Sequence, residues 1–494
     1  MSGPTGRTSD LHRRVTGGFG NLNAMSHVTA AARGALLGSG GATTPAKAHG
    51  RAREAWNGGT ALIAAGCATM AMSVVLFLAD GGLARFATLG GALVAVGVLA
   101  GLLATNALLL MLLLAARVPL IDGSLGQPRA MSLHSRLGDQ VVYGLGVHAV
   151  FLLLGYMVLD NASLVAEWAY LWPQSDFVLT VVGMGLLLLV VVSSVVAARR
   201  RLPYEVWHGI HLTSYAAVGL AIPHMFSMSG LLGEGSWQRT YWIAIMVVTG
   251  AALLVFRFLA PLVISLRHKL WVVSVQPAGP DAYNIELSGR RLDRLGARSG
   301  QYLHWRFLGK GLWWHQHPFS LSAAPGPDKL RITVRSRGGG SAALASVLPG
   351  TRVFVEGPYG SFTDRARTSK TIALVGAGIG IAPIRALLED ATFAPGCATV
   401  ILRASRPEEL YLLDEIERLC HRRGASLIVL TGHRAEGCWV PADRVDLTLS
   451  ERVPGLADVD LYVCGPSGFT ALVTAEAVAS GVPARRIHVE DFNW

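Results

Sequence analysis

Cysteine is scarce in this chain of 494 residues, and its spacing is irregular. No C-x-x-C pair occurs, so the sequence indicates neither a disulfide framework nor an iron–sulfur site. We therefore expect the soluble part of the protein to lie in the cytosol. The five cysteines are Cys67, Cys397, Cys420, Cys438 and Cys464.

Charged residues are also few. They make up 15% of the chain against 51% hydrophobic residues, and the mean hydropathy is +0.43, which is too apolar for an ordinary soluble enzyme. Long uncharged runs fall between Ala61 and Leu266, whereas the composition after His268 is that of a soluble protein. The sequence thus predicts a membrane half followed by a soluble half.

Two other features are missing. The net charge of +11 is not accompanied by a basic stripe interleaved with aromatic residues, so nucleic acid is not an expected partner. Residues 1–55 lack the apolar block of a secretory signal and are predicted to form a disordered basic tail in the cytosol.

The membrane half contains six stretches long enough to cross a bilayer. A helix needs about 20 apolar residues to do so. We predict a six-helix transmembrane domain over residues 56–267, with spans near 57–79, 86–116, 138–158, 177–198, 207–227 and 240–266.

Arginine and lysine cluster at alternate ends of these spans. If the helices alternate in direction, all the clusters fall on one side, and positively charged loops stay in the cytoplasm. This predicts a multi-pass protein of the cell membrane with both termini and the soluble half in the cytoplasm. The clusters comprise Arg51 with Arg53, Arg117 with Arg129 and Arg136, Arg199 to Arg201, and Arg267 with Lys269.

Histidines are the unusual residues of the membrane half, because ionisable side chains in lipid are commonly functional. His134 and His148 are fourteen residues apart, a rise of roughly 21 Å along one helix face. His211 and His224 are thirteen apart, a rise of roughly 20 Å. A single such histidine is often a polar group bonded within the bundle, but two pairs at matched depths favour two stacked bis-histidine b-type haems.

The fifth span fits this scheme only if it is distorted. On an ideal helix, His211 and His224 point about 140° apart, and Pro223 provides a cause for a kink because it cannot donate a helix hydrogen bond. His208 competes with His211 as the inner ligand, but its rise to His224 of roughly 24 Å matches the other helix less well. We favour His211 and assign His208 a packing or propionate-binding role.

The soluble half changes pattern near residue 366. Short β-type runs separated by turns predict a small antiparallel barrel over 268–366. From 367 to 494, strands alternate with helices, which predicts a parallel α/β nucleotide-binding domain.

A glycine-rich turn follows the first strand of the α/β region. The apolar run Ile372–Val375 leads into Gly376, Gly378, Gly380 and Pro383 and then into a helix. Glycines at this point let a pyrophosphate approach the helix N-terminus. Alone, this turn is a weak signal, but its strand–turn–helix setting favours nucleotide binding.

Three other strings stand at strand ends. They are H-P-F-S at 317–320, G-P-Y-G at 357–360 and C-G-P at 464–466. The Ser320 hydroxyl is suited to bond a flavin ring nitrogen. The backbone amides around Gly338 to Ser341, including Gly340, are suited to hold a pyrophosphate. The small Cys464 thiol is suited to lie against a flat ring. The alternative interpretations, without any ligand, are ordinary turns for the strings and a buried core position for Cys464.

Together, these strings and histidine spacings resemble the ferric reductase and NADPH oxidase superfamily, and the likeness covers about Ala61 to Trp494. Its members join a six-helix haem domain to a ferredoxin-reductase-like dehydrogenase. The resemblance implies hydride transfer from NAD(P)H to FAD, then single electrons to an inner haem (His134, His211) and an outer haem (His148, His224). It implies FAD binding by His317, Pro318, Phe319, Ser320, Arg335 and Ser341, and NAD(P)H binding by Gly376, Gly378, Gly380, Pro383, Cys464, Gly465 and Pro466.

The resemblance also implies an aromatic residue near the C-terminus that covers the flavin. Phe492 and Trp494 are both candidates, with Phe492 slightly favoured. Two departures concern the acceptor: Leu152 stands where superoxide-forming animal oxidases have a further histidine, and Arg85 replaces a typical arginine only with a one-residue offset. Ala382 stands where a threonine is common in the glycine turn.

The expected function is transmembrane electron transfer from NAD(P)H to oxygen, forming superoxide, or to a ferric chelate. Arg403 and Arg406, after the second α/β strand, favour NADPH over NADH as ligands of a 2′-phosphate, although surface charge is the alternative. A reductase for quinone or a membrane partner protein remains an alternative, as does a nucleotide-regulated transporter. Partner proteins are not indicated.

Overall fold

The computed structural model describes residues 46–198, 202, 204–227 and 230–492. The chain divides into two units, residues 1–54 and 55–494. The predicted basic tail lies mostly outside the described residues, but its last part is helical, because α2 (Ala46–Ala79) begins before residue 55.

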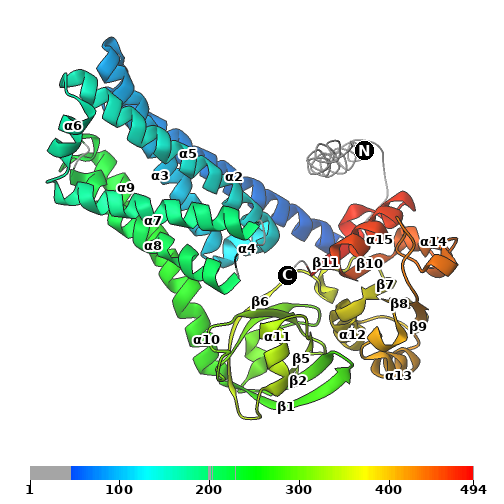
Figure 1. Ribbon diagram of the computed structural model, residues 1–494. Coiled ribbons are helices and arrows are strands. Elements are labelled where there is room, and N and C mark those ends of the chain that lie inside the picture. Colours follow the sequence, from blue (N-terminus) through cyan, green and yellow to red (C-terminus); the bar gives the residue numbers. More distant parts are fainter. Residues whose placement is uncertain (1–45, 199–201, 203, 228–229, 493–494) are drawn as a thin grey trace, which may run out of the picture. The chain divides into compact units, whose positions relative to one another are not determined.

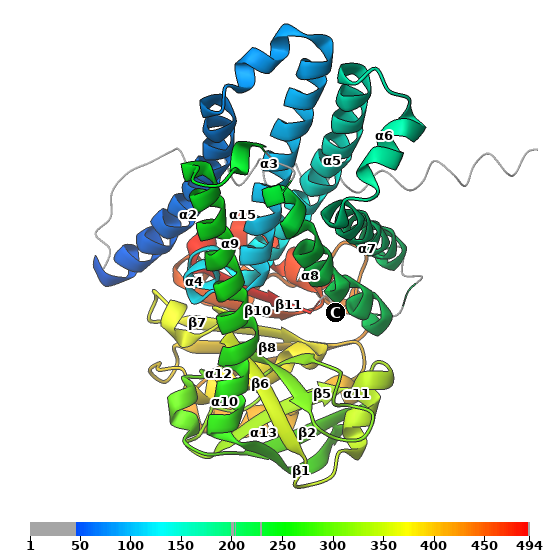
Figure 2. The same ribbon diagram turned by 90° about the vertical axis from the view of Figure 1, so that its left-hand side faces the viewer.

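Long apolar helices build the first half of the second unit (Figure 1). After α2 come α3 (Leu89–Ala115), α5 (Gln127–Leu159), α7 (Ser175–Ala198), α8 (Tyr204–Ser227) and α9 (Trp237–Ala252). A π-helical segment, η4 (Leu253–Leu259), joins α9 to α10 (Ala260–His268), and Figure 2 shows the three as one continuous helix. Short elements connect the long ones: η2 (Gly82–Ala87), α4 (Pro119–Leu125), α6 (Leu164–Leu171) and η3 (Gly230–Leu232).

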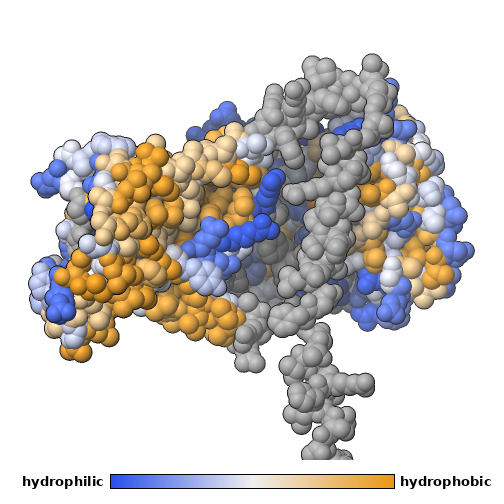
Figure 3. Space-filling model, turned by 90° about the horizontal axis from the view of Figure 1, so that it is seen from above, coloured by the Kyte–Doolittle hydropathy of each residue, from blue (hydrophilic) through white to orange (hydrophobic). Residues whose placement is uncertain are grey.

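Five of these helices are long and apolar enough to cross a membrane, and apolar side chains gather over this half in Figure 3. They correspond to five of the six predicted spans. The remaining one, predicted near 207–227, folds as the helix α8 but is not among the five, so the count of six stays a prediction.

Small residues allow α3 and α5 to pack closely. A Cβ atom at Gly144 of α5 would lie 2.8 Å from Cβ of Ala104, and one at Gly155 would lie 2.6 Å from the Val94 side chain. Contacts this short require glycine, because a side chain would push the helices apart. The interface of α3 and α5 is therefore fixed by its glycines.

The soluble half begins with a six-stranded antiparallel barrel in the order β4-β3-β6-β1-β2-β5. Alternate residues of each strand point inward, as in β3, where Leu303, Trp305 and Phe307 are all buried. This confirms the predicted barrel. Its strands are β1 (Leu270–Gly279), β2 (Ala282–Ser288), β3 (Tyr302–Phe307), β4 (His317–Ser320), β5 (Lys329–Arg335) and β6 (Arg352–Tyr359).

A five-stranded parallel sheet follows, in the order β11-β10-β7-β8-β9. Helices α12 (Ile381–Asp390) and α13 (Leu413–Arg423) pack on one face, and α15 (Ser467–Ala479) packs on the other (Figure 1). This confirms the predicted α/β region. Its strands are β7 (Ile372–Ala377), β8 (Ala398–Ala404), β9 (Ser426–Thr431), β10 (Asp460–Gly465) and β11 (Ile487–Asp491).

Candidate functional site

The four membrane histidines form two facing pairs. The ring centroids of His134 on α5 and His211 on α8 lie 6.4 Å apart, and those of His148 and His224 lie 6.2 Å apart. Both α8 rings thus face α5, although an ideal helix would point His211 and His224 about 140° apart. Pro223 lies inside α8 directly before His224, where the sequence predicts a distortion.

These separations fit a metal held between two imidazoles. Metal–nitrogen bonds of about 2 Å on each side separate the two nitrogens by about 4 Å, and ring centroids set about one ångström further back then lie about 6 Å apart. Within the described ranges, no cluster of three or more His, Cys, Asp or Glu side chains could hold a bare metal ion. Haem supplies its own equatorial nitrogens, so paired histidines suffice for it.

Backbone carbonyls orient three of the four rings. Nδ1 of His134 lies 2.9 Å from the Met111 carbonyl oxygen, and Nδ1 of His148 lies 2.9 Å from that of Gly97. Nδ1 of His224 lies 2.6 Å from the Ala221 oxygen. A carbonyl accepts only from a protonated nitrogen, so Nε2 carries the lone pair for a metal in each ring.

His211 is held differently. Its Nδ1 is buried without a hydrogen-bond partner, and its ring packs against the Trp207 ring at 5.1 Å. The ring that faces His134 is that of His211, and the choice of His211 over His208 as the inner ligand stays a prediction.

Glycines on α3 make room for the outer pair, and the sequence analysis missed them. A Cβ atom at Gly101 would lie 2.4 Å from Nδ1 of His148. One at Gly97, whose carbonyl binds that nitrogen, would lie 2.9 Å from the Leu152 backbone nitrogen. The spacing G-x-x-x-G was visible in the sequence and is the signal that could have identified them.

The H-P-F-S string forms β4, which pairs with β3. The Ser320 hydroxyl and Nε2 of His317 are both buried without a partner, as expected for groups that bond a ligand such as a flavin. The His317 ring stacks on Phe319 at 5.6 Å. Burial, with a smaller effect of His315, lowers the pKa of His317 to about 4, so its ring is neutral near pH 7.

Of the other predicted flavin ligands, Gly340 lies beside this strand, whereas Ser341 and Arg335 bond other groups of the protein. A Cβ atom at Gly340 would lie 2.9 Å from Cε1 of His317, so a side chain there would displace the His317 ring. Ser341 donates to the Gly338 carbonyl oxygen at 3.2 Å. Arg335 pairs with Asp281 at 2.7 Å and Glu409 at 3.0 Å, so its charge is already neutralised by carboxylates.

The glycine turn and the C-G-P string meet at the carboxyl ends of neighbouring strands. β7 and β10 pair in parallel, with Gly376 opposite Cys464. A Cβ atom at Gly380 would lie 2.4 Å from the Cys464 carbonyl oxygen, so this close approach requires glycine. Cys464 is fully buried, and burial raises the pKa of its thiol well above its usual value, which keeps the thiol neutral. Pro383 is buried in the first turn of α12.

The two candidate 2′-phosphate ligands differ sharply. Arg403 is buried and donates to the carbonyl oxygens of Trp439, Ala404 and Gly432, so its guanidinium is committed to the backbone. Arg406 has a 65% exposed side chain and pairs with Glu409 at 2.9 Å. Of the two, only Arg406 keeps its guanidinium exposed to solvent.

The C-terminal strand returns to the same edge. Phe492 donates its backbone N–H to the Gly465 carbonyl at 3.2 Å and is partly buried; Trp494 lies outside the described residues. Glu490, which the sequence analysis missed, lies opposite Cys464 on β11 and near Gly360. Burial, and then Asp491, raises the pKa of Glu490 to about 8.

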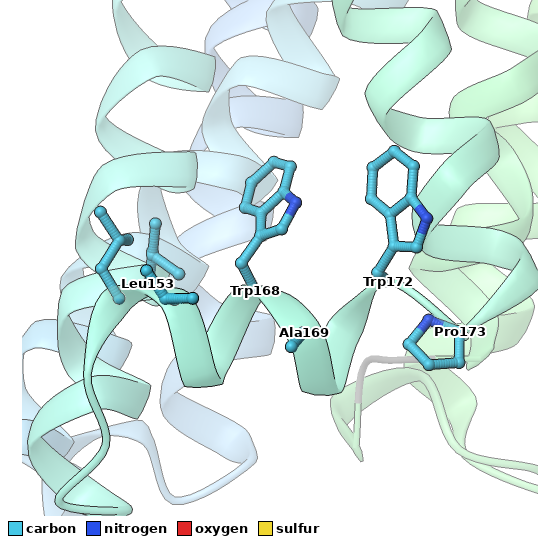
Figure 4. A pocket seen from close by; sticks show the side chains of 7 residues that line it. Leu153, Trp168, Ala169, Trp172 and Pro173 are labelled. Atoms are coloured by element: carbon cyan, nitrogen blue, oxygen red, sulfur yellow. The ribbon is translucent and has the colours of Figure 1, made fainter.

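An apolar pocket of about 840 Å³ lies where α6 approaches the end of α5. The indole rings of Trp168 and Trp172 stack at 6.0 Å and extend from α6 to the same side (Figure 4). Leu153, five residues beyond His148, lines the pocket, so the pocket lies roughly 7.5 Å further along the helix axis than the outer histidine.

Comparison with known families matches the three parts of the chain. The ferric reductase like transmembrane component matches residues 100–222, an FAD-binding domain matches 272–363, and the oxidoreductase NAD-binding domain matches 374–475. A flavohemoprotein of Xylella fastidiosa is 26% identical over 201 residues, which cover 40% of this chain and 51% of that protein. The reductase component of propane 2-monooxygenase from a Gordonia species is 27% identical over 232 residues, 45% of this chain and 66% of that protein.

The chain therefore spans about half the length of the flavohemoprotein that it matches. Among solved structures, the FAD/NAD-binding domain of nitric oxide dioxygenase from Vibrio cholerae is similar, with 24% identity and a TM-score of 0.39. That match covers 46% of this chain and 99% of that one.

The apolar helices, the barrel and the nucleotide-binding sheet define a multi-pass membrane protein with the domains of an NAD(P)H-dependent flavin oxidoreductase. The three matched domains, in this order, place the chain in the ferric reductase and NADPH oxidase-like flavocytochrome family.

Proposed function

We propose that this protein transfers electrons from cytoplasmic NAD(P)H across the membrane to an acceptor on the far side. The observation that carries the proposal is the facing of two histidine pairs, at 6.4 and 6.2 Å, on helices α5 and α8. When bound, FAD supplies hydride acceptance and release of single electrons, and two b-type haems supply one-electron relay. Both termini and the dehydrogenase half would lie in the cytoplasm.

The chain's own residues bind and orient. Ser320 and His317 would offer their unpartnered polar atoms to the flavin, and the neutral Cys464 thiol and Gly465, both buried at the end of β10, would place no charge beside the nicotinamide. Phe492, whose backbone N–H bonds the Gly465 carbonyl, would cover the flavin before the nucleotide binds. Arg406 supports NADPH over NADH, and Arg403 orders the loop around Trp439 rather than contacting phosphate.

Oxygen, giving superoxide, and a ferric chelate are the proposed acceptors. Arg85, the candidate outer arginine, pairs with Asp80 at 2.8 Å, and Leu152 packs against α3 at Gly97. Neither observation supports a polar oxygen-binding site built from these two residues.

A quinone is the second candidate acceptor, and the pocket at α6 favours it. Its lining is apolar, its tryptophans are partly exposed, and its volume suits a small aromatic ligand. Stacked indole rings bind flat aromatic rings well.

The test is an absorption spectrum of the detergent-purified protein with FAD and NADPH, recorded without air and then in air. We expect reduced b-type haem bands that vanish when oxygen is admitted, with dye reduction sensitive to superoxide dismutase. Bands that persist in air but vanish on addition of a ferric chelate or a quinone identify those acceptors instead.

Two variants make this test specific. His148→Ala should remove one haem per chain, whereas His421→Ala, an exposed histidine on α13, should remove none. A purified protein without any haem bands would refute the proposal and return the transporter alternative, which predicts no turnover of NAD(P)H.

A further inference from the structure

Glu356 is buried on β6 at the point where its regular pairing with β3 ends. Four other side chains contact its carboxylate. Its Oε1 lies 3.1 Å from Nη1 of Arg257 and accepts from the Tyr359 hydroxyl at 2.9 Å. Its Oε2 accepts from Nε2 of Gln316 at 2.8 Å. Nε of Arg117 lies 3.5 Å from Oε1. Arg117 and Arg257 come from the membrane helices, so one carboxylate joins the barrel to both of them.

Arg117 reaches this carboxylate from an unusual backbone conformation. It follows the last residues of α3 with φ of 64°, the left-handed conformation that normally favours glycine at the end of a helix. Its side chain lies 4.7 Å over the Tyr359 ring, and its Nη2 lies 3.3 Å from Nε2 of His304. Arginine is strained at such a position where glycine would not be, and the contacts of its side chain offset that strain.

Arg257 also comes from irregular backbone. It lies in η4, the π-helical segment between α9 and α10. A π-helical insertion shifts the side chains that follow around the helix axis, and such insertions concentrate at functional sites. Two separate departures from regular helix thus deliver the two arginines to Glu356.

Electrostatics agree with a permanently charged cluster. Burial raises the pKa of Glu356, but Arg257, Arg117 and the bond from Gln316 outweigh burial and leave that pKa below its usual value. Burial and the charge of Arg117 lower the pKa of His304 to about 4, so its neutral ring can accept from the guanidinium. The Ser265 hydroxyl of α10 reinforces the contact, since it bonds both the N–H and the C=O of Val355.

The members of this cluster adjoin the H-P-F-S string, the G-P-Y-G string and the helix end near the inner histidine. Gln316 directly precedes His317, and Glu356 directly precedes Gly357 of the G-P-Y-G string. Met111, whose carbonyl orients His134, lies near the end of α3, and Arg117 follows that same end. A continuous path of contacts therefore runs from His134 through α3 and Glu356 to the flavin-binding strands.

We propose that Glu356, paired with Arg117 and Arg257, is a positioning residue that fixes the flavin-binding strands against the inner histidine pair. Its contacts thereby govern the rate at which electrons pass from the dehydrogenase half into the membrane half. This proposal rests on the proposed function. Removing one member of a buried, hydrogen-bonded charge pair leaves the others unpaired, which loosens the contact strongly.

The test compares Glu356→Gln and Arg117→Gly with Glu286→Gln, an exposed glutamate of the same barrel, in full-length FAD- and haem-loaded protein. Anaerobic stopped-flow absorbance follows flavin reduction and haem reduction separately. We expect flavin reduction within about twofold of the unmodified rate, and haem reduction slowed about tenfold or more in the first two variants only. Amide exchange at Val355, measured by mass spectrometry without NADPH, should rise in the same two variants.

Arg117→Gly separates positioning from folding. Glycine relieves the left-handed strain at this position and so offsets part of the stability lost with the buried charge contact. Unmodified haem content and flavin reduction show that the variant is folded, and slow haem reduction then comes from the lost contact. Haem reduction and Val355 exchange at unmodified levels in both variants would overturn the proposal. If the unmodified protein shows no haem bands, the proposed function fails, but Val355 exchange still decides whether Glu356 holds the two halves together.

Discussion

Replacing Gly101 by alanine places a methyl group where the ring of His148 now lies. The added Cβ would be 2.4 Å from Nδ1, 2.8 Å from Cε1 and 3.1 Å from Cγ of that ring, whereas ordinary contacts begin at 3.4 Å. The ring must therefore move by about 1 Å, because α3 and α5 are held together by other close glycine contacts.

The cost of this movement has two parts. Overpacking a tight interior site costs about 1–3 kcal/mol. A ring displaced this far also gives up the 2.9 Å bond between Nδ1 and the Gly97 carbonyl, a net loss of about 1 kcal/mol. The sum of about 2–4 kcal/mol corresponds to roughly 30-fold to 1000-fold weaker ligation at the outer pair.

The assay counts haem per chain and titrates reduction in the presence of mediators. Gly101→Ala should purify with about one haem per chain and titrate as a single component, because the inner pair of His134 and His211 lies far from the substitution. Gly146→Ala is the matched control. Gly146 lies on the same helix as His148, and a Cβ atom there would have nothing within 4 Å. A Gly101→Ala protein with two haems and an unchanged titration would refute the reasoning.

Three further changes test other parts of the structure. Ser320→Ala removes the unpartnered hydroxyl and should weaken FAD binding about tenfold by fluorescence titration, with no change in melting temperature of the FAD-free protein. Because the pKa of Glu490 is raised from 4.5 to about 8, folded protein retains a proton that unfolded chain loses in this window, so stability should fall as pH rises through it. Glu490→Gln should flatten that fall in thermal melts. Asn106→Leu removes an amide that bonds Thr69 and Ser73 across α2 and α3, and should lower the melting temperature in detergent while leaving NADPH-dependent flavin reduction unchanged.

Local patterns were enough to predict the classes of element. The strand–turn–helix around Gly378 and the alternating burial of β3 depend on residues adjacent in the chain, and both appear in the structure as expected. The helix spans follow from composition alone, although α8, with its histidines and Pro223, is too polar to join the five clear spans. Hydrophobic length is a weak guide where a helix carries functional polar groups.

The supporting residues could not be predicted in the same way. Gly101 matters only because α3 lies against His148, and Glu490 matters only because β11 pairs with β10 at Cys464. Arg403 illustrates the opposite case: its position near the carboxyl end of β8 suited a phosphate ligand, but the carbonyl oxygens of Trp439, Ala404 and Gly432 take up its donors.

The sequence by itself determined the order of the domains, the spacing of the histidines along their helices and the strings at the strand ends, because periodicity and turn chemistry act over a few residues. Tertiary structure alone decided which rings face each other, which glycines make room for them, and that Glu356 meets two arginines from distant helices. These contacts join residues far apart in the chain, and only close packing of complete helices and strands brings them together.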